Sequence, residues 1–369
     1  MLITISKQTL ATALSQAVRF IPKKAELAVL TNFLFEIDGN QMQITASNAE
    51  SRFTTSVECK SKETFRMCFP VTALDALKKL PEQPVTIDSD GRNTTVNYSG
   101  GSFEICCDDP SAYPAKYEQK YSTTQVAIEA SLLASGIGSV VDCTSTDMKT
   151  RPVINCVSIQ IEGGKVSFYG TDTHIMGAAS FDVAGQPDTK MLISRINATS
   201  LKSILESCDG MAEITVGDRW TDFALNGMTI SLRNLEHKTP NYRSIVPKSF
   251  KINFTESQSS LIDCIERVRC FSDSLGMVSF DMTSESLVIS SQDIDFSVSA
   301  KEERHVETGC TAKFSINLLS SNLLTVLKGV GSGNVIFSMN DAKSAVLIKP
   351  EKLQDECEKF YIVMPMLKM

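Results

Sequence analysis

The chain has 369 residues, a formal net charge of −7 and 42% hydrophobic residues. This length suggests two or three domains, and the hydrophobic content is sufficient for a buried core in each. The sequence contains no run of eighteen apolar residues and no apolar stretch of the signal-peptide kind at its start, so we expect neither a membrane span nor export. The eleven cysteines include no C-x-x-C pair, so we expect reduced thiols in a cytoplasmic protein.

The N-terminal third contains two copies of one pattern: a strand, a helix and three strands. The first copy is expected as strand 3–6, helix 7–20 and strands 33–37, 41–46 and 52–59, with a hairpin turn at Asp38 and Gly39. The second copy is expected as strand 64–69, helix 71–80 and strands 85–88, 94–98 and 102–106.

The middle third repeats both copies. The first is expected as strand 126–129, helix 131–141 and strands 153–161, 165–171 and 174–181, with Gly163 and Gly164 in the turn. The second is expected as strand 190–194, helix 195–207 and strands 213–217, 223–225 and 228–232.

The last third follows the same order. It is expected as strand 251–254, helix 257–271 and strands 277–282, 286–290 and 294–301, then strand 311–316, helix 318–328 and strands 334–339, 345–350 and 361–365. Six β-α-β-β-β patterns at regular spacing indicate an internal repeat. We therefore predict an α+β protein of three similar domains, 1–121, 122–250 and 251–369, with antiparallel sheets.

The charge is distributed unevenly between helices and the rest of the chain. The expected helices and their flanks hold eleven basic and four acidic residues, a net charge of +7. The rest of the chain therefore has a net charge of −14, which gives the total of −7. Basic helices in an acidic body suit a protein that holds a polyanion on one surface; ordinary solvated helix faces are the alternative. The candidate DNA-binding residues on helices and their flanks are Arg19, Lys23, Lys24, Lys78, Lys79, Lys202 and Arg267.

Motifs for catalysis and metal binding are weak. The three histidines have no companions at zinc-ligand spacing, so we expect no metal and no cofactor. The glycine-rich stretch 329–333 follows a helix instead of opening one, which favours a helix C-cap. Asp172 and His174 could form half of a catalytic triad, although no nucleophile stands nearby in sequence and such a pair more often belongs to a hydrogen-bonded turn. The chain ends with the apolar, methionine-rich stretch 360–369, which is typical of a closing strand or of an adaptable binding wall.

Three local motifs, in the order in which they occur, carry a resemblance to a known family. They are the TDTHIMG stretch from Thr171, the PNYRSIVP stretch from Pro240 and the terminal IVMPM stretch from Ile362. Together with the sixfold pattern, they resemble the bacterial DNA polymerase III beta subunit, the sliding clamp, over the whole chain.

The resemblance implies a ring-shaped head-to-tail homodimer with helices inside and sheets outside. It implies a non-catalytic processivity factor that encircles double-stranded DNA without sequence preference. The implied partners are the DNA polymerase III alpha subunit, the clamp loader and other proteins with a clamp-binding motif. These partners would insert short peptides into a pocket between the second and third domains.

The resemblance also implies roles for particular residues. Lys24, Lys149 and Arg151 match positions near DNA. The pocket would be formed by Arg151, Ile154, Thr171, Thr173, His174, Met176, Pro240, Ser244, Ile245, Val346, Ile362, Val363, Met364, Pro365 and Met366. The dimer interface would join Phe103 and Ile105 of one copy to Cys270 and Phe271 of the other.

The sequence departs from the family at the pocket rim. Thr173 replaces a usual glycine, while Ile175 and Ser244 replace arginines, which puts the usual peptide preference in question. The expected helix 131–141 carries no charge, so it would attract DNA little. Two other functions therefore stay open: a clamp-like interaction scaffold without DNA tethering, and a three-domain enzyme that uses Asp172 and His174.

Overall fold

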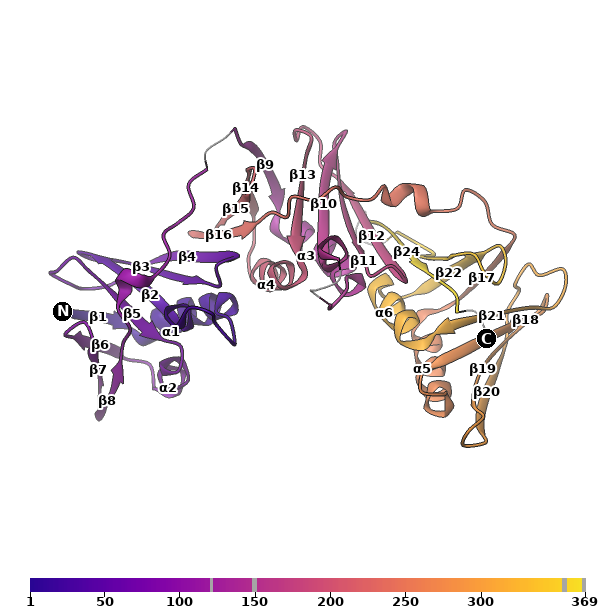
Figure 1. Cartoon of the computed structure of the whole chain (residues 1–369), viewed down its shortest axis with the longest axis horizontal. Coiled ribbons are helices and arrows are strands. Elements are labelled where there is room, and N and C mark those ends of the chain that lie inside the picture. Colours follow the sequence, from indigo (N-terminus) through magenta and orange to yellow (C-terminus); the bar gives the residue numbers. More distant parts are fainter. Residues whose placement is uncertain (120–121, 148–150, 354–356, 367–369) are drawn as a thin grey trace. The chain divides into compact units, whose positions relative to one another are not determined.

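The structure is a computed structural model that describes residues 1–119, 122–147, 151–353 and 357–366. Within these residues the predicted β-α-β-β-β pattern is confirmed in all six positions (Figure 1). The α-helices are α1 (Lys7–Ala17), α2 (Ala73–Lys79), α3 (Ala130–Val140), α4 (Arg195–Leu205), α5 (Gln258–Val268) and α6 (Ser320–Val330).

The strands follow the predicted order, with shifts that are largest in the last third: the strand expected at 294–301 lies at Val298–His305, and the strand expected at 361–365 lies at Glu358–Val363. In the first third they are β1 (Leu2–Ser6), β2 (Asn32–Asp38), β3 (Gln41–Ser47), β4 (Ser51–Glu58), β5 (Phe65–Pro70), β6 (Pro84–Ser89), β7 (Asn93–Tyr98) and β8 (Gly101–Cys106). In the middle third they are β9 (Thr124–Glu129), β10 (Cys156–Glu162), β11 (Lys165–Thr171), β12 (Ile175–Asp182), β13 (Thr189–Ser194), β14 (Met211–Val216), β15 (Trp220–Leu225) and β16 (Met228–Arg233). In the last third they are β17 (Ile252–Ser257), β18 (Met277–Met282), β19 (Ser286–Asp293), β20 (Val298–His305), β21 (Phe314–Leu319), β22 (Asn334–Met339), β23 (Val346–Pro350) and β24 (Glu358–Val363).

The chain folds into two compact units. The first unit comprises Met1–Ser131 and Ser200–Asn234, and the second comprises Leu132–Thr199 and Leu235–Met369. The first unit holds a sheet of order β1-β6-β7-β8 and an eight-stranded sheet of order β5-β2-β3-β4-β16-β15-β14-β9. The second unit holds an eight-stranded sheet of order β13-β10-β11-β12-β24-β23-β22-β17 and a sheet of order β20-β19-β18-β21. All pairings are antiparallel, as predicted.

Neighbouring patterns exchange their first strands. β1 leaves its own pattern and pairs with β6, with Ile3 opposite Ile87, while β5 returns to pair with β2. The same exchange joins β13 to β10 and β9 to β14, and later β21 to β18 and β17 to β22. In the last third, the two patterns that share strands in this way bury one common core, so neither pattern is complete alone.

The helices pack against the sheets through one apolar face. In α5 the buried residues are Leu261, Cys264, Ile265 and Val268, which recur at helical spacing. The Ser257 hydroxyl accepts a hydrogen bond from the Ser260 N–H and caps the helix. α5 lies beside α6 and contacts β17, β19 and β20. Fully burying one such apolar side chain contributes about 1.5–3 kcal/mol.

Short 3₁₀ segments and glycines end the elements. The expected long helices finish as the 3₁₀ turns η1 (Val18–Phe20), η4 (Val141–Cys143) and η7 (Arg269–Phe271), because the last turn of a helix tightens where its carbonyls lack partners. Gly331 caps α6 with φ +95°, as predicted for the glycine-rich stretch. Among the described residues, none of the helices combines the length and the apolar character needed to span a membrane.

Candidate partner groove and basic helices

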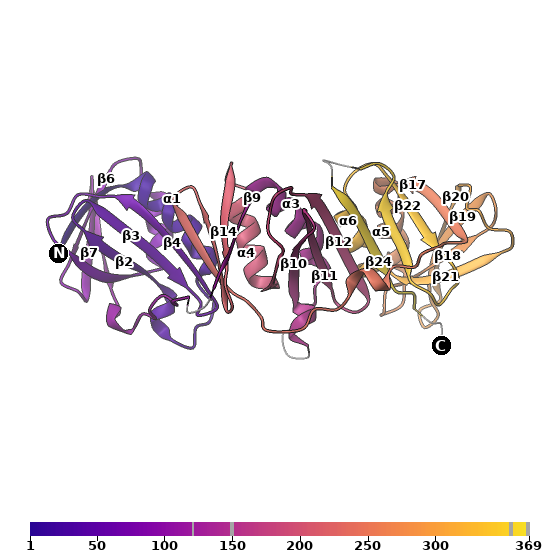
Figure 2. The same ribbon diagram turned by 90° about the horizontal axis from the view of Figure 1, so that it is seen from above.

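A junction between two half-sheets underlies the candidate partner groove in the second unit, and the apolar residues that cluster there are buried. β12 pairs with β24 along the edges of the two half-sheets, as Figure 2 also shows. Met176 faces Ile362 across this junction, and Ile362 faces Leu347 on β23. The apolar residues that cluster on this face are Tyr169, Met176, Ala178, Tyr242, Leu347 and Ile362. We call this set the groove cluster.

The segment before β17 is anchored over these strands by an aromatic stack. Tyr242, in the 3₁₀ turn η6 (Tyr242–Ile245), stacks on Tyr169 with ring centroids 4.6 Å apart and planes 8° apart. The Arg243 Nε donates a hydrogen bond of 3.2 Å to the Tyr169 hydroxyl. Burial raises the pKa of Tyr242 to about 12, because the phenolate form would lose its hydration. This anchor fixes the exposed residues Ser244 and Ile245 beside the groove cluster.

The rim between β11 and β12 is a turn built around Asp172. The Asp172 carboxylate accepts hydrogen bonds from the His174 N–H at 2.8 Å and from the Ile175 N–H at 2.7 Å. The Thr171 hydroxyl donates to the Ile175 carbonyl at 2.6 Å. The turn therefore explains the pairing of Asp172 with His174 structurally. Thr173 adopts φ +85° here, a conformation that a β-branched residue rarely takes.

The end of the chain forms the other rim. The Met364 N–H donates to the His174 carbonyl and the Met366 N–H donates to the Asn317 carbonyl, both at 2.8 Å. The Met364 side chain is 38% exposed, although an apolar side chain gains free energy from burial. An exposed methionine beside an apolar cluster provides an adaptable contact surface.

The structure separates the expected pocket residues other than Arg151 and Ile154 into three sets. Met176 and Ile362 belong to the groove cluster. The rim and its flanks carry Thr171, Thr173, His174, Pro240, Ser244, Ile245, Met364, Pro365 and Met366, which are exposed or half-buried. Val346 and Val363 lie in the core cluster of α5 and α6. Strand alternation turns these two valines to the face opposite Ile362 and Leu347, so their side chains do not belong to the groove cluster.

Four groove residues escaped the sequence analysis: Tyr169, Ala178, Tyr242 and Leu347. Tyr169 and Leu347 could have been found by alternation, because each shares its face with an expected pocket residue on the same or the neighbouring strand. Tyr242 carries no such signal, since its burial depends on the stack with Tyr169.

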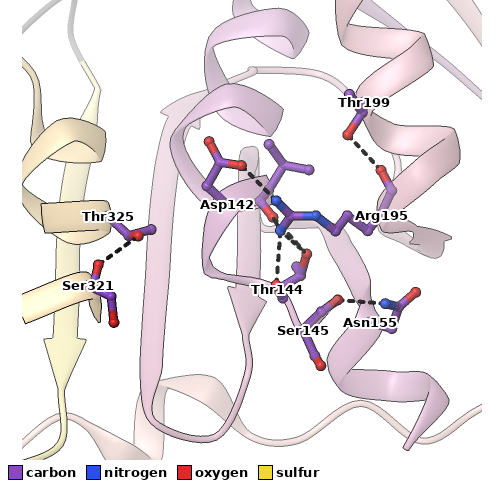
Figure 3. A network of polar contacts seen from close by, with 9 residues as sticks. Asp142, Thr144, Ser145, Asn155, Arg195, Thr199, Ser321 and Thr325 are labelled. Carbon is purple, nitrogen blue, oxygen red and sulfur yellow. Dashed lines mark hydrogen bonds and ion pairs between the residues drawn. The ribbon is translucent and has the colours of Figure 1, made fainter. Parts of the chain in front are cut away.

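An arginine network holds the loop that follows α3. Arg195, the first residue of α4, binds the Asp142 carboxylate at 2.8 Å, the Thr144 carbonyl at 2.9 Å and the Val141 carbonyl (Figure 3). The Asn155 amide then donates to the Ser145 carbonyl and closes the loop. This loop leads to the 3₁₀ turn η5 (Pro152–Asn155), which contains the half-buried Ile154, and Arg151 stands exposed just before it.

The candidate DNA-binding residues differ in how they are engaged. Lys202 forms an ion pair with Glu206 at 3.1 Å, and Arg267 binds Glu302 through two hydrogen bonds of 2.7 and 2.9 Å. Arg19 donates to the Ser203 carbonyl. The described residues provide no ion pair for the exposed side chains of Lys23, Lys24, Lys78, Lys79 and Arg151. Lys149 lies outside the described residues.

The expected dimer residues lie next to two sheet edges. Phe103 and Ile105 lie on β8, the last strand of its sheet in the first unit. Cys270 and Phe271 lie in η7, which contacts the edge strand β20 in the second unit. Phe271 is 43% exposed. Among the described residues, His, Cys, Asp and Glu form no group of three that could hold a metal ion.

Solved structures of sliding clamps share the fold of this chain. The chain has the fold of a sliding clamp: it matches the crystal structure of DNA polymerase III subunit beta from Pseudomonas aeruginosa with a TM-score of 0.91 at 22% identity, covering 99% of this chain and 100% of that chain. It matches the beta subunit from Thermotoga maritima with a TM-score of 0.92 at 18% identity, covering 100% of both chains.

Sequence comparison gives the particular relatives, the bacterial beta sliding clamps. Residues 1–116 match the model of the DNA polymerase III beta subunit, N-terminal domain. The chain is 24% identical to the beta sliding clamp of Synechocystis, covering 96% of each protein. It is 23% identical to that of Pseudomonas aeruginosa, covering 98% of this chain and 99% of the relative. The resemblance predicted from the three motifs is confirmed.

Proposed function

We propose that this protein is a DNA polymerase processivity factor: a non-catalytic sliding clamp that encircles duplex DNA and tethers the replicative polymerase through the candidate groove over the junction of β12 and β24. The observation that carries this proposal is the match of sequence and fold to sliding clamps along the whole chain. The proposed domains are 1–121, 122–250 and 251–369. The proposed location is the bacterial cytoplasm, where replication takes place.

A ring requires two copies, and the sheet edges support one way of joining them. Inside the chain, half-sheets are joined twice, by β4 with β16 and by β12 with β24. The equivalent strands of the remaining half-sheets are β20 and β8, which are both sheet edges within the described residues. An exposed strand edge has unpaired N–H and C=O groups. We therefore propose that β20 of one copy pairs with β8 of a second copy, which gives a head-to-tail homodimer.

The two internal junctions also provide the register for this pairing. Phe53 faces Ile230 in the first junction, and Gly177 faces Tyr361 in the second. Equivalent positions on the four strands can be found through the residues that face them in their hairpins. By this comparison Ala300 is equivalent to Phe53, and Phe103 is equivalent to Ile230. Transferred to two copies, this register places Phe103 opposite Ala300 and Ser102 opposite Lys301.

Disulfide trapping tests this register. In a protein whose exposed Cys106 and Cys270 are changed to serine, Ser102→Cys combined with Lys301→Cys should give a covalent dimer after oxidation. The matched control combines Ser102→Cys with Glu303→Cys, displaced by two positions, and should crosslink much less. A chain that elutes from gel filtration as a 40.4 kDa monomer, or that crosslinks equally in both variants, would contradict the dimer proposed here.

We propose that the cations of the first unit supply most of the attraction for DNA. Lys23, Lys24, Lys78 and Lys79 are exposed and without ion pairs in the described part of the chain, whereas Lys202 is paired. Such contacts act on phosphates without reading sequence and weaken with salt. Replacing both Lys78 and Lys79 by alanine should lower the slope of log K against log salt by about 2. Lys202→Ala is the matched control and should change the slope less.

Processive synthesis on primed circular DNA tests the function itself. With a bacterial polymerase III and clamp loader, both proposed partners, the protein should lengthen the products of a single binding event. Unchanged products from a protein that still binds clamp-binding peptides would favour the scaffold without DNA tethering. Deleting residues 364–369 should abolish peptide binding and leave the dimer intact, because the proposed pairing between copies is made by β8 and β20. Retained peptide binding would reject the groove.

A further inference from the structure

A cavity lies in the first unit, at the junction of β4 and β16. Its volume is about 220 Å³, and it is covered by the segment 114–119 at the end of the first third of the chain. Pockets that bury whole small-molecule ligands measure about 300–1,000 Å³. A cavity of this size is therefore better matched to one or two side chains of a longer partner.

The floor of the cavity is a polar row across four strands. Ser47, Arg52, Ser231 and Asp222 occupy consecutive partner positions on β3, β4, β16 and β15. The Arg52 Nη1 donates to the Pro114 carbonyl at 2.9 Å. Within the described residues Arg52 has no ion pair, and burial lowers its pKa because the guanidinium has lost part of its hydration. A desolvated guanidinium favours a carboxylate that can bind it through two hydrogen bonds.

The wall of the cavity is aromatic. Tyr117 stacks with Trp220 at a centroid distance of 5.9 Å and an interplanar angle of 27°. The Gln119 Nε2 donates to the Trp220 carbonyl at 2.8 Å, while its Oε1 is buried without a partner among the described residues. Lys116 pairs with Asp222 at 3.9 Å, so the charged side chains that line the cavity sum to one positive charge, that of Arg52.

The internal repeat relates this cavity to the groove of the second unit. Each site lies on a junction of half-sheets, and each is covered by a segment at the end of one third of the chain, 114–119 in the first unit and 242–250 in the second. Their chemistry differs, because the groove cluster is apolar whereas this cavity has a cation on its floor and an aromatic pair on its wall. The two sites therefore suit different sequences.

We propose that this cavity is a second peptide-binding site, which takes an extended segment of a partner protein that carries an acidic residue two positions before an aromatic one. The acidic side chain would bind Arg52, and the aromatic side chain would pack against Tyr117 and Trp220. In an extended chain, residues two positions apart point to the same side and lie about 7 Å apart. Arg52 and Trp220 lie on strands separated by β16, a span that two long side chains of such a segment can bridge.

Tryptophan fluorescence tests the proposal directly. Trp220 is the single tryptophan of the chain, so its emission reports on this cavity and not on the second-unit groove. The probe is a capped pentapeptide of sequence serine–aspartate–alanine–phenylalanine–serine. It should change the emission of Trp220 saturably, and the same peptide with asparagine for aspartate should bind about tenfold more weakly, because a charge-assisted pair is lost.

Variants locate the contact. Arg52→Gln should remove the preference for aspartate over asparagine, while the exposed Arg66→Gln should keep it, since Arg66 pairs with Glu36 outside the cavity. The comparison of the two peptides on the unaltered protein stands even if Arg52→Gln does not fold. No saturable change up to millimolar peptide, or equal binding of both peptides, would overturn the proposal. It stands or falls independently of the processivity assay, which does not involve this cavity.

Discussion

Thr173→Gly should stabilise the second unit, although it shortens a side chain. Thr173 adopts φ +85° at the rim of the groove, and a non-glycine residue held in such a conformation costs about 1–3 kcal/mol. Glycine takes this conformation freely, but its unfolded chain has more freedom, which costs about 0.5–1 kcal/mol. The Thr173 side chain is exposed, and the hydrogen bond from its N–H to the Thr171 hydroxyl does not depend on the side chain. The net gain should be about 1 kcal/mol.

Differential scanning calorimetry measures this gain. For a unit of 150–250 residues, 1 kcal/mol raises Tm by about 2–4 °C, so Thr173→Gly should shift the second-unit transition upward by that amount. Thr311→Gly is the matched control, because Thr311 is exposed and has no positive φ; it should lower Tm slightly. A lower Tm for Thr173→Gly, or equal shifts in both variants, would refute the reasoning that the rim is strained.

Two further changes test packing and electrostatics in the second unit. Gly136→Ala should destabilise it by about 1–3 kcal/mol, measured by urea unfolding, because the added Cβ would lie 2.3 Å from the Phe168 ring; unchanged stability would contradict that contact. The hydrogen bond from Arg267 lowers the pKa of Glu302, so the stability from this pair is present above the unfolded pKa and is lost as pH falls through the folded one. Glu302→Gln should therefore be destabilising at pH 7 and nearly neutral in acid; a penalty independent of pH would show that the carboxylate charge is not responsible.

The local patterns of the sequence predicted the elements well. Alternation along the strands and turn residues such as Gly163 and Gly164, with φ of +58° and +79°, are local properties, so six β-α-β-β-β patterns could be predicted and all six are present. The same locality limits the prediction of function. Arg267 was expected to bind DNA, which stays a prediction, but its ion pair with Glu302 could not be read from the local sequence because Glu302 is 35 positions away in the chain.

The groove illustrates the boundary in another way. Its motifs could be recognised from the residues themselves, and they led to the correct family of relatives. Which side chains face the groove depends on the register between β12, β24 and β23. A shift of one residue in a strand turns every side chain to the other face. The side-chain directions of Val363 and Ile362 are therefore opposite, although both lie in one motif.

The sequence by itself determined the number, kind and order of the elements, the repeat and the resemblance to sliding clamps. These features depend on residue spacing and on short motifs, which need no partner elsewhere in the chain. Only the tertiary structure decided the exchange of first strands between neighbouring patterns, the stack of Tyr242 on Tyr169 and the cavity beside Trp220. Each of these joins residues that are distant along the chain, and their contact depends on which strand edges pair.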